Sequence, residues 1–237
     1  MTGYMICATP RSGSTLLCAL LRASGVAGWP ESWFRAADRE NWAEEWRAAP
    51  GFGGYLAAAR VAGRHAGSVF GLRMMGENLG DLLGDLAVMI PVPTGDRQRL
   101  SDALGVTQYI HLYRRDLVAQ AVSRHRAEVS GIWHPGIEEA AQPVQPSYDF
   151  AAIRGFVGAA RAENAGWERW FSTQGITPLK VDYEDLAADP AGVAGRVLDH
   201  LGLTAAHRLT APNRRMADAT SALWAARFRA EAGLAPG

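Results

Sequence analysis

The sequence predicts an α/β fold in which helices flank both faces of a mostly parallel β-sheet. Apolar runs typical of buried strands lie near residues 4–8, 68–73, 106–113 and 177–182, and helical patterns separate them. Such alternation is typical of a parallel sheet, because parallel strands need a long crossover connection. The first run also passes through a tight turn directly into a helical pattern, an arrangement that is typical of anion-binding loops.

Length and composition indicate a single compact domain over residues 1–237. The chain is 48% hydrophobic and 20% charged, which is ordinary for a globular protein. Helical patterns extend over residues 14–24, 77–89, 116–130, 150–172 and 190–201. Asp189 before Pro190 is a typical cap and first residue for the last of these helices.

Charge and cysteine content exclude several classes of protein. The formal net charge is zero, so no general affinity for nucleic acid or acidic membranes is expected. Cys7 and Cys18 lie in apolar surroundings, and we expect buried free thiols. No charged leader precedes an apolar signal segment, and no apolar stretch reaches membrane-spanning length. We therefore expect a cytoplasmic protein without membrane insertion.

Residues 9–15 join the first strand to the first helix and read Thr-Pro-Arg-Ser-Gly-Ser-Thr. The unpaired N–H groups and the positive dipole end of the helix start favour an anion there. The turn adds a cation, a permissive glycine and three hydroxyl groups, from Arg11, Gly13, Ser12, Ser14 and Thr15. These residues predict a phosphate site, although an ordinary strand-to-helix turn is the alternative interpretation.

The loop differs from that of an ATPase. A Walker loop requires a lysine after its second glycine, whereas Ser14 follows Gly13 and the only lysine of the chain is Lys180. The sequence therefore disfavours a nucleotide or nucleoside kinase.

A second basic segment follows the strand predicted at residues 106–113. Arg114 lies at the carboxyl end of that strand, the edge at which open α/β sheets bind ligands. Ser123 follows on the next helix, and a solvated charge pair that caps this helix is the alternative interpretation. Two basic sites at strand ends together suggest a ligand with two separated anionic groups.

These segments resemble those of sulfotransferases. Residues 9–15 are similar to the 5′-phosphosulfate loop, residues 113–123 to the 3′-phosphate segment, and residues 181–186 to the Tyr-Glu-Asp-Leu segment of those enzymes. The resemblance is closest to the bacterial trehalose 2-sulfotransferase family. Its motifs occur in the family's order from residue 4 to about residue 230.

The resemblance implies the sulfotransferase fold, with a P-loop-like parallel β-sheet. It also implies 3′-phosphoadenosine 5′-phosphosulfate (PAPS) as co-substrate, a sugar hydroxyl as acceptor, no metal, and a possible homodimer. Arg11, Ser12, Ser14 and Thr15 are candidates for the leaving phosphate, as is Arg73, which stands where related enzymes carry a basic residue. The candidates for the 3′-phosphate are Arg114, Ser123, Arg214 and Arg215. Arg73 and the segment around Arg214 have equally plausible interpretations as solvated surface groups.

The expected general base departs from the family pattern. Related enzymes have Gly-x-Pro-x-Glu-aromatic-Phe with the glutamate as base, whereas residues 28–34 read Gly-Trp-Pro-Glu-Ser-Trp-Phe. Ser32 occupies the glutamate position and Glu31 precedes it. Three interpretations remain open: Glu31 is the base, His125 or His111 is the base, or the enzyme is weak or altered.

Two less regular regions are candidates for the acceptor site. Residues 29–49 contain Trp33, and residues 132–148 contain Trp133. Trp33 could stack on a sugar face of a small-molecule hydroxyl acceptor, although tryptophans at helical spacing are more often core residues. Residues 132–148 form a long polar loop of the kind that covers active sites, and we expect both Trp33 and Trp133 to bind the substrate. The alternative function is a catalytically silent homologue that binds a nucleotide or a carbohydrate. The sequence does not name the acceptor.

Overall fold

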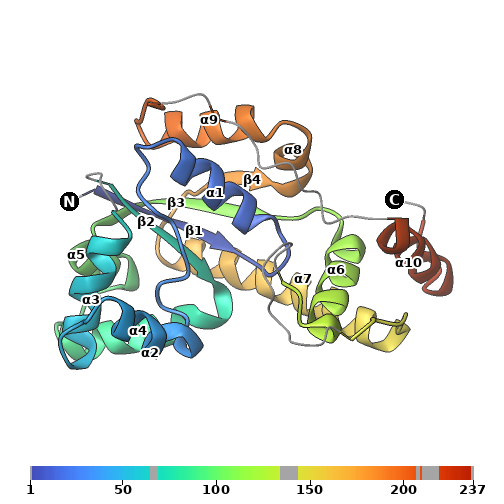
Figure 1. Ribbon diagram of the computed structural model, residues 1–237, viewed down its shortest axis with the longest axis horizontal. Helices are drawn as coiled ribbons and strands as arrows, with labels where there is room; N and C mark the ends of the chain where they lie inside the picture. The colour runs from blue at the N-terminus through green and yellow to red at the C-terminus, as the bar shows by residue number, and fades with distance from the viewer. Residues whose placement is uncertain (1, 65–68, 134–143, 207–208, 210–218, 236–237) are drawn as a thin grey trace.

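The computed structural model describes residues 2–64, 69–133, 144–206, 209 and 219–235. Its sheet contains β1 (Thr2–Ala8), β2 (Val69–Met75), β3 (Val106–Tyr113) and β4 (Leu179–Asp182), in the order β2-β1-β3-β4 (Figure 1). All three pairings are parallel. The predicted parallel α/β architecture is therefore confirmed.

Helices cover both faces of this sheet (Figure 1). α1 (Ser14–Ala23), α8 (Tyr183–Ala188) and α9 (Pro190–His200) lie on one face. α3 (Gly51–Ala62), α4 (Gly76–Met89), α5 (Asp96–Leu104) and α7 (Phe150–Thr173) lie on the other. The remaining helical elements of the described residues are the 3₁₀ turn η1 (Ala36–Asp38), α2 (Arg39–Glu45), α6 (Leu117–Ser130) and α10 (Ala219–Glu231).

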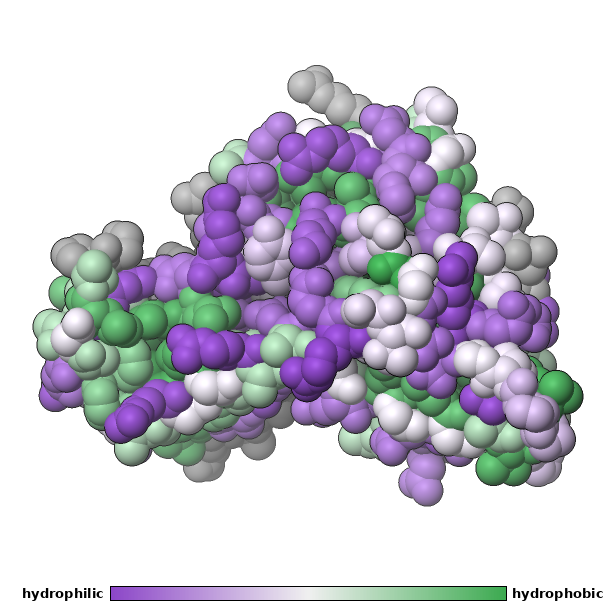
Figure 2. Space-filling view, turned by 180° about the vertical axis from the view of Figure 1, so that it is seen from behind, coloured by the Kyte–Doolittle hydropathy of each residue, from purple (hydrophilic) through white to green (hydrophobic). Residues whose placement is uncertain are grey.

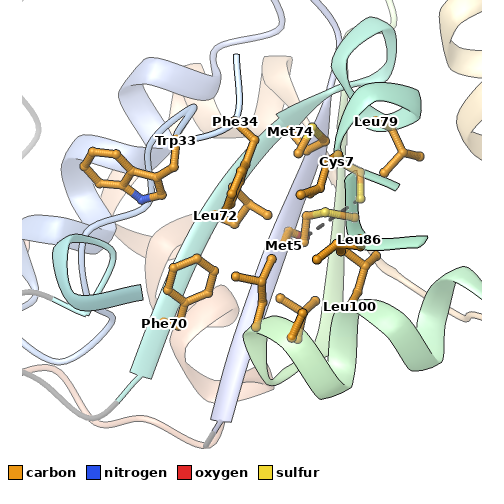
Figure 3. Close-up of a cluster of buried hydrophobic side chains, with 14 of the residues drawn as sticks. Met5, Cys7, Trp33, Phe34, Phe70, Leu72, Met74, Leu79, Leu86 and Leu100 are labelled. Atoms are coloured by element: carbon orange, nitrogen blue, oxygen red, sulfur yellow. Dashed lines mark hydrogen bonds between the residues drawn. The ribbon is translucent and has the colours of Figure 1, made fainter. Parts of the chain in front are cut away.

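Alternation along β1 explains why both faces are covered. Tyr4 and Ile6 point to the α1/α9 face, whereas Met5 and Cys7 point to the opposite face, and all four are fully buried. On that opposite face, Met5 and Cys7 lie against Leu72 and other apolar side chains of the core (Figure 3). The parallel register aligns the carboxyl ends of the strands, so the segments that follow β1, β2 and β3 gather at one edge.

A third apolar cluster lies away from the sheet. It joins α6, α7 and α10 through Val118, Val122, Ile153 and Phe228. This end of the molecule also presents exposed apolar side chains such as Leu223, and hydrophobic residues gather on it in the view from behind (Figure 2). The cluster holds α10 against the helix that follows Arg114.

The five predicted helices are all present with slightly different bounds, but the described residues also form six helical elements that were not predicted. These are η1, α2, α3, α5, α8 and α10. α8 and α2 are too short for a clear period, and α3 begins with three glycines in four residues, at 51, 53 and 54. Tertiary packing supplies their stability instead.

The structure corrects the acceptor-site interpretation of Trp33. This side chain is only 1% exposed, and its indole N–H donates to the carbonyl oxygens of Trp29 (3.1 Å) and Gly71 (3.2 Å). Trp42 and Trp46 pack edge-on against the same ring, with centroids 5.2 and 5.4 Å away. Because its faces are enclosed, Trp33 belongs to the core and holds residues 29–34 against β2.

The expected cysteine state is confirmed, since Cys7 and Cys18 are both buried and free. Burial raises the pKa of the Cys18 thiol to about 12, an effect that nearby Arg73 opposes. None of the described helices is both long enough and apolar enough to cross a membrane.

Trp33→Phe is expected to lower the free energy of unfolding by roughly 2–4 kcal/mol, because it removes packing and the indole N–H that donates to the buried Gly71 carbonyl and the partly buried Trp29 carbonyl. Urea denaturation measures this effect. Leu223→Ala is the control, because that side chain is 69% exposed. An unchanged midpoint for Trp33→Phe would contradict the structural role.

His111 is expected to make stability sensitive to acid. Burial lowers the pKa of this imidazole, although Glu168 at 3.4 Å opposes the shift. The unfolded chain therefore takes up a proton at a pH where the folded chain does not. The free energy of unfolding should fall as pH drops below the usual histidine value near 6.5, by at most about 1.4 kcal/mol per pH unit.

His111→Gln should flatten this slope in denaturation curves recorded between pH 7 and 5. His200→Gln, which removes an exposed imidazole, should leave it unchanged. Equal slopes in wild type and His111→Gln would refute the assignment.

Candidate active site

The loop after β1 is held by contacts within itself. Ser12 is fully buried, and both its backbone N–H (3.3 Å) and its hydroxyl (2.7 Å) donate to the carbonyl oxygen of Thr9. Arg11 and Gly13 both adopt positive φ angles, 64° and 88°. The hydroxyl of Ser12 thus stabilises the turn. The hydroxyl groups of Ser14 and Thr15 lie at the start of α1.

The start of α1 suits an anion because no side chain caps it. Its first helical hydrogen bond runs from Leu17 N–H to the Gly13 carbonyl (3.1 Å), so the preceding amides lie outside the helical pattern. Ser14 and Thr15 occupy the first turn. A Cβ atom at Gly13 would lie 2.6 Å from Tyr183 Cδ2, so this position requires glycine for close packing as well as for its φ angle.

Arg11 connects the two segments that the sequence assigns to different anions. Its Nε donates to Ser123 Oγ (3.0 Å), and its Nη1 donates to the Trp133 carbonyl oxygen (2.6 Å). The guanidinium carbon also lies 6.0 Å from the centroid of the Trp133 ring. The structure therefore brings Arg11, Ser123 and Trp133 together at the same edge of the sheet.

Arg114 lies directly after β3, against Tyr183. Its guanidinium carbon is 4.4 Å from the centroid of that ring, and its Nε is 3.8 Å from a Glu184 carboxylate oxygen. Burial lowers the pKa of Arg114, while Tyr183 and Glu184 act in the opposite direction. Since Tyr183 also contacts the position of Gly13, this ring lies between the two basic segments.

Arg115, the next residue, is more exposed than Arg114 and pairs with carboxylates. Arg115 is 58% exposed and pairs with Asp182 (3.2 Å) and Glu184 (3.7 Å). Glu184 also accepts from the backbone N–H groups of Arg115 (3.1 Å) and Asp116 (3.2 Å). These contacts fix the turn that leads into α6, where Asp116 caps the helix by accepting from Ala119 N–H (2.9 Å).

Arg73 gathers the candidate base and the loop around one guanidinium group. Its Nη1 donates to Thr15 Oγ1 (3.1 Å), its Nε donates to Ser32 Oγ (2.9 Å), and its Nη2 forms an ion pair with Glu31. Ser32 N–H donates to the same carboxylate (2.8 Å). The Arg73 side chain is therefore enclosed by three polar partners and is not a solvated surface cation.

Backbone pairing fixes the position of Glu31. Arg73 N–H donates to the Glu31 carbonyl (3.0 Å), and Glu31 forms a parallel bridge with Leu72. Its side chain remains 31% exposed. The carboxylate is thus held at the edge of the sheet beside Thr15, although Ser32 occupies the family's glutamate position.

The two histidines considered as alternative bases are enclosed. His111 packs against Phe171 and lies beneath Glu168 of α7. His125 Nε2 lies 2.8 Å from the Ser147 carbonyl oxygen, and its ring packs near Trp224. Both imidazoles are at least 95% buried, whereas the Glu31 side chain is 31% exposed.

Some predicted site residues lie outside the described part of the chain, and one residue near the loop was not predicted. Arg214, Arg215 and residues 134–143 lie outside the described residues. The sequence interpretation did not assign Tyr183 to the site, although its position in the Tyr-Glu-Asp-Leu segment was a usable signal. Within the described ranges, no group of three or more His, Cys, Asp or Glu side chains has an arrangement suited to a metal ion.

Known proteins resemble this chain along nearly its whole length. The family model described as Stf0 sulphotransferase matches residues 3–231. Trehalose 2-sulfotransferase of Mycobacterium tuberculosis (strain ATCC 35801 / TMC 107 / Erdman) is 32% identical over 97% of this chain and 95% of its own length. Its counterpart in Mycolicibacterium smegmatis (strain ATCC 700084 / mc(2)155) is also 32% identical, over 98% and 96%.

A solved sulfotransferase from Alicyclobacillus acidocaldarius shares 15% identity with the chain, with a TM-score of 0.48 and coverage of 100% of this chain and 97% of that one. The match of the family model over nearly the whole length, together with the two relatives, is the evidence for classification. The chain therefore belongs to the Stf0 sulphotransferase family.

Proposed function

We propose that this sulfotransferase moves a sulfuryl group from PAPS to a hydroxyl group of a sugar or a glycosylated small molecule. The observation that carries the proposal is the contact of the uncapped loop before α1 with the Arg114–Ser123 segment through Arg11 and Tyr183. PAPS has anionic groups at its 5′ and 3′ ends, which matches two neighbouring basic sites. The relatives named trehalose 2-sulfotransferase support a sugar acceptor.

The loop would hold the 5′ end of PAPS. Amide groups at the start of α1, the hydroxyls of Ser14 and Thr15, and the cations Arg11 and Arg73 would stabilise the leaving phosphate. Arg114 and Ser123, which are both partly buried, would contact the 3′-phosphate, and we assign Arg214 and Arg215 to the same role. The Nε of Arg114 is buried and has no hydrogen bond within the described part of the chain, only the long ion pair with Glu184 (3.8 Å), which fits an anion as an additional partner of this guanidinium group.

Glu31 would take the proton of the acceptor hydroxyl. PAPS supplies the sulfuryl group, and the S–O bond to the acceptor forms as the bond to the leaving phosphate breaks. Glu31 is a partly exposed carboxylate that pairs with Arg73, so it is held next to the group that would bind the leaving phosphate. Trp133, which touches Arg11 through its carbonyl, would border the acceptor.

Incubation with ³⁵S-labelled PAPS and a panel of sugars that includes trehalose tests the proposal. We expect label on a sugar hydroxyl and release of 3′-phosphoadenosine 5′-phosphate (PAP) that depends on the acceptor. Tight binding of PAP without any transfer across the panel would instead favour the catalytically silent homologue.

Glu31→Gln is expected to lower kcat roughly 10²- to 10⁴-fold, because it removes the base while it preserves size and hydrogen-bonding capacity. The Kd for PAP, measured by calorimetry, should not rise. Asp85→Asn is the matched control, because Asp85 is similarly exposed (34%) and pairs with Arg39 at 2.7 Å in the helical layer. Full activity in Glu31→Gln would eliminate this carboxylate as the base.

A further inference from the structure

Gln120 of α6 connects that helix to the anion-binding loop. Its side chain is 1% exposed, and its Nε2 donates to Thr9 Oγ1 (2.9 Å) and to the Pro10 carbonyl oxygen (2.7 Å). Thr9 and Pro10 are the first residues after β1. One amide group of α6 therefore holds the entrance of the loop at two points.

The orientation of this amide follows from chemistry. The carbonyl oxygen of Pro10 accepts hydrogen bonds and donates none, so the nitrogen of the amide must face it. The Oε1 atom is then left buried with no hydrogen-bond partner among the residues described. Such a group is costly, and an apolar side chain of the same length would avoid that cost. The two hydrogen bonds to the loop are the contribution that offsets it.

The same helix also holds the next residue of the loop. Ser123, one helical turn beyond Gln120, accepts from Arg11 Nε (3.0 Å). Arg11 has a φ angle of 64°, a region that residues other than glycine adopt only where their surroundings determine it. Because Gln120 fixes the Pro10 carbonyl, it fixes the peptide plane that leads into Arg11.

Gln120 therefore belongs to the helix that links the two proposed anion subsites. α6 begins shortly after Arg114, which belongs to the 3′ subsite, and its side chains hold the loop that forms the 5′ subsite. We propose that Gln120 is a positioning residue that sets the spacing between the two subsites. This proposal rests on the proposed function, since it assumes a ligand that occupies both.

The test compares PAP with 5′-AMP and 3′-AMP, each of which has only one of the two anionic groups. Gln120→Met removes both hydrogen bonds while it keeps an unbranched side chain of similar length. We expect its Kd for PAP to rise about tenfold, with a smaller rise for either monophosphate, because each subsite survives but their spacing is lost. The ratio of the AMP and PAP dissociation constants should therefore fall.

Two further variants make this comparison specific. Gln108→Met is the matched control, because the amide of Gln108 donates to the His200 carbonyl oxygen (3.3 Å) and belongs to the opposite end of β3. It should keep the wild-type ratio. Thr9→Val removes one of the two acceptors of Gln120 and should lower the ratio less than Gln120→Met, so it also tests the proposal if Gln120→Met does not fold.

A merely structural Gln120 gives a different result. In that case the melting temperature falls in Gln120→Met and Thr9→Val, but the folded proteins keep the wild-type ratio of dissociation constants, which overturns the proposal. If wild type itself binds PAP no better than the monophosphates, the proposed function fails along with this inference. A retained ratio in the variants with a strong PAP preference in wild type overturns the inference alone.

Discussion

The parallel pairing of β1 with both β2 and β3 is the constraint on which the site depends. It buries β1 on both faces and aligns the carboxyl ends of three strands, so Ala8 lies beside Met75 and Leu112. Segments far apart in the chain then meet at one edge. The loop after β1, Arg73 near the end of β2 and Arg114 after β3 owe their proximity to this register. A shift of one residue would turn Arg73 toward the opposite face.

The site's cations are preorganised by polar partners within the protein. Arg11 contacts Ser123 and the Trp133 carbonyl, Arg73 contacts three side chains, and Arg114 stacks on Tyr183. A zero net charge makes such local organisation necessary, because the chain as a whole does not concentrate anions. Holding the charges in place reduces the ordering that an anionic ligand must impose on binding. The ion pair of Arg73 with Glu31 holds the proposed stabiliser of the leaving phosphate beside the proposed base.

Sequence patterns predicted the sheet, the loop and the basic strand ends, because these depend on short local signals such as apolar runs, a Ser/Gly turn and charged residues at strand ends. They did not predict α3 or α5, whose helical conformation depends on packing against the sheet. Trp33 was misassigned because an exposed and an enclosed tryptophan have the same spacing in the sequence. Tyr183 and Gln120 contact the loop across 170 and 111 residues of sequence respectively, and a single sequence does not display such long-range contacts.

Thermal unfolding in the presence of PAP, ADP or ATP tests the two-anion site most directly. At about 100 times Kd, a ligand that binds only the folded chain adds roughly 2.7 kcal/mol, which is several degrees for a protein of this size. The site described here predicts that PAP stabilises the protein and that ADP and ATP, which lack the 3′-phosphate, do so far less. Equal stabilisation by ATP, or none by PAP, would contradict it.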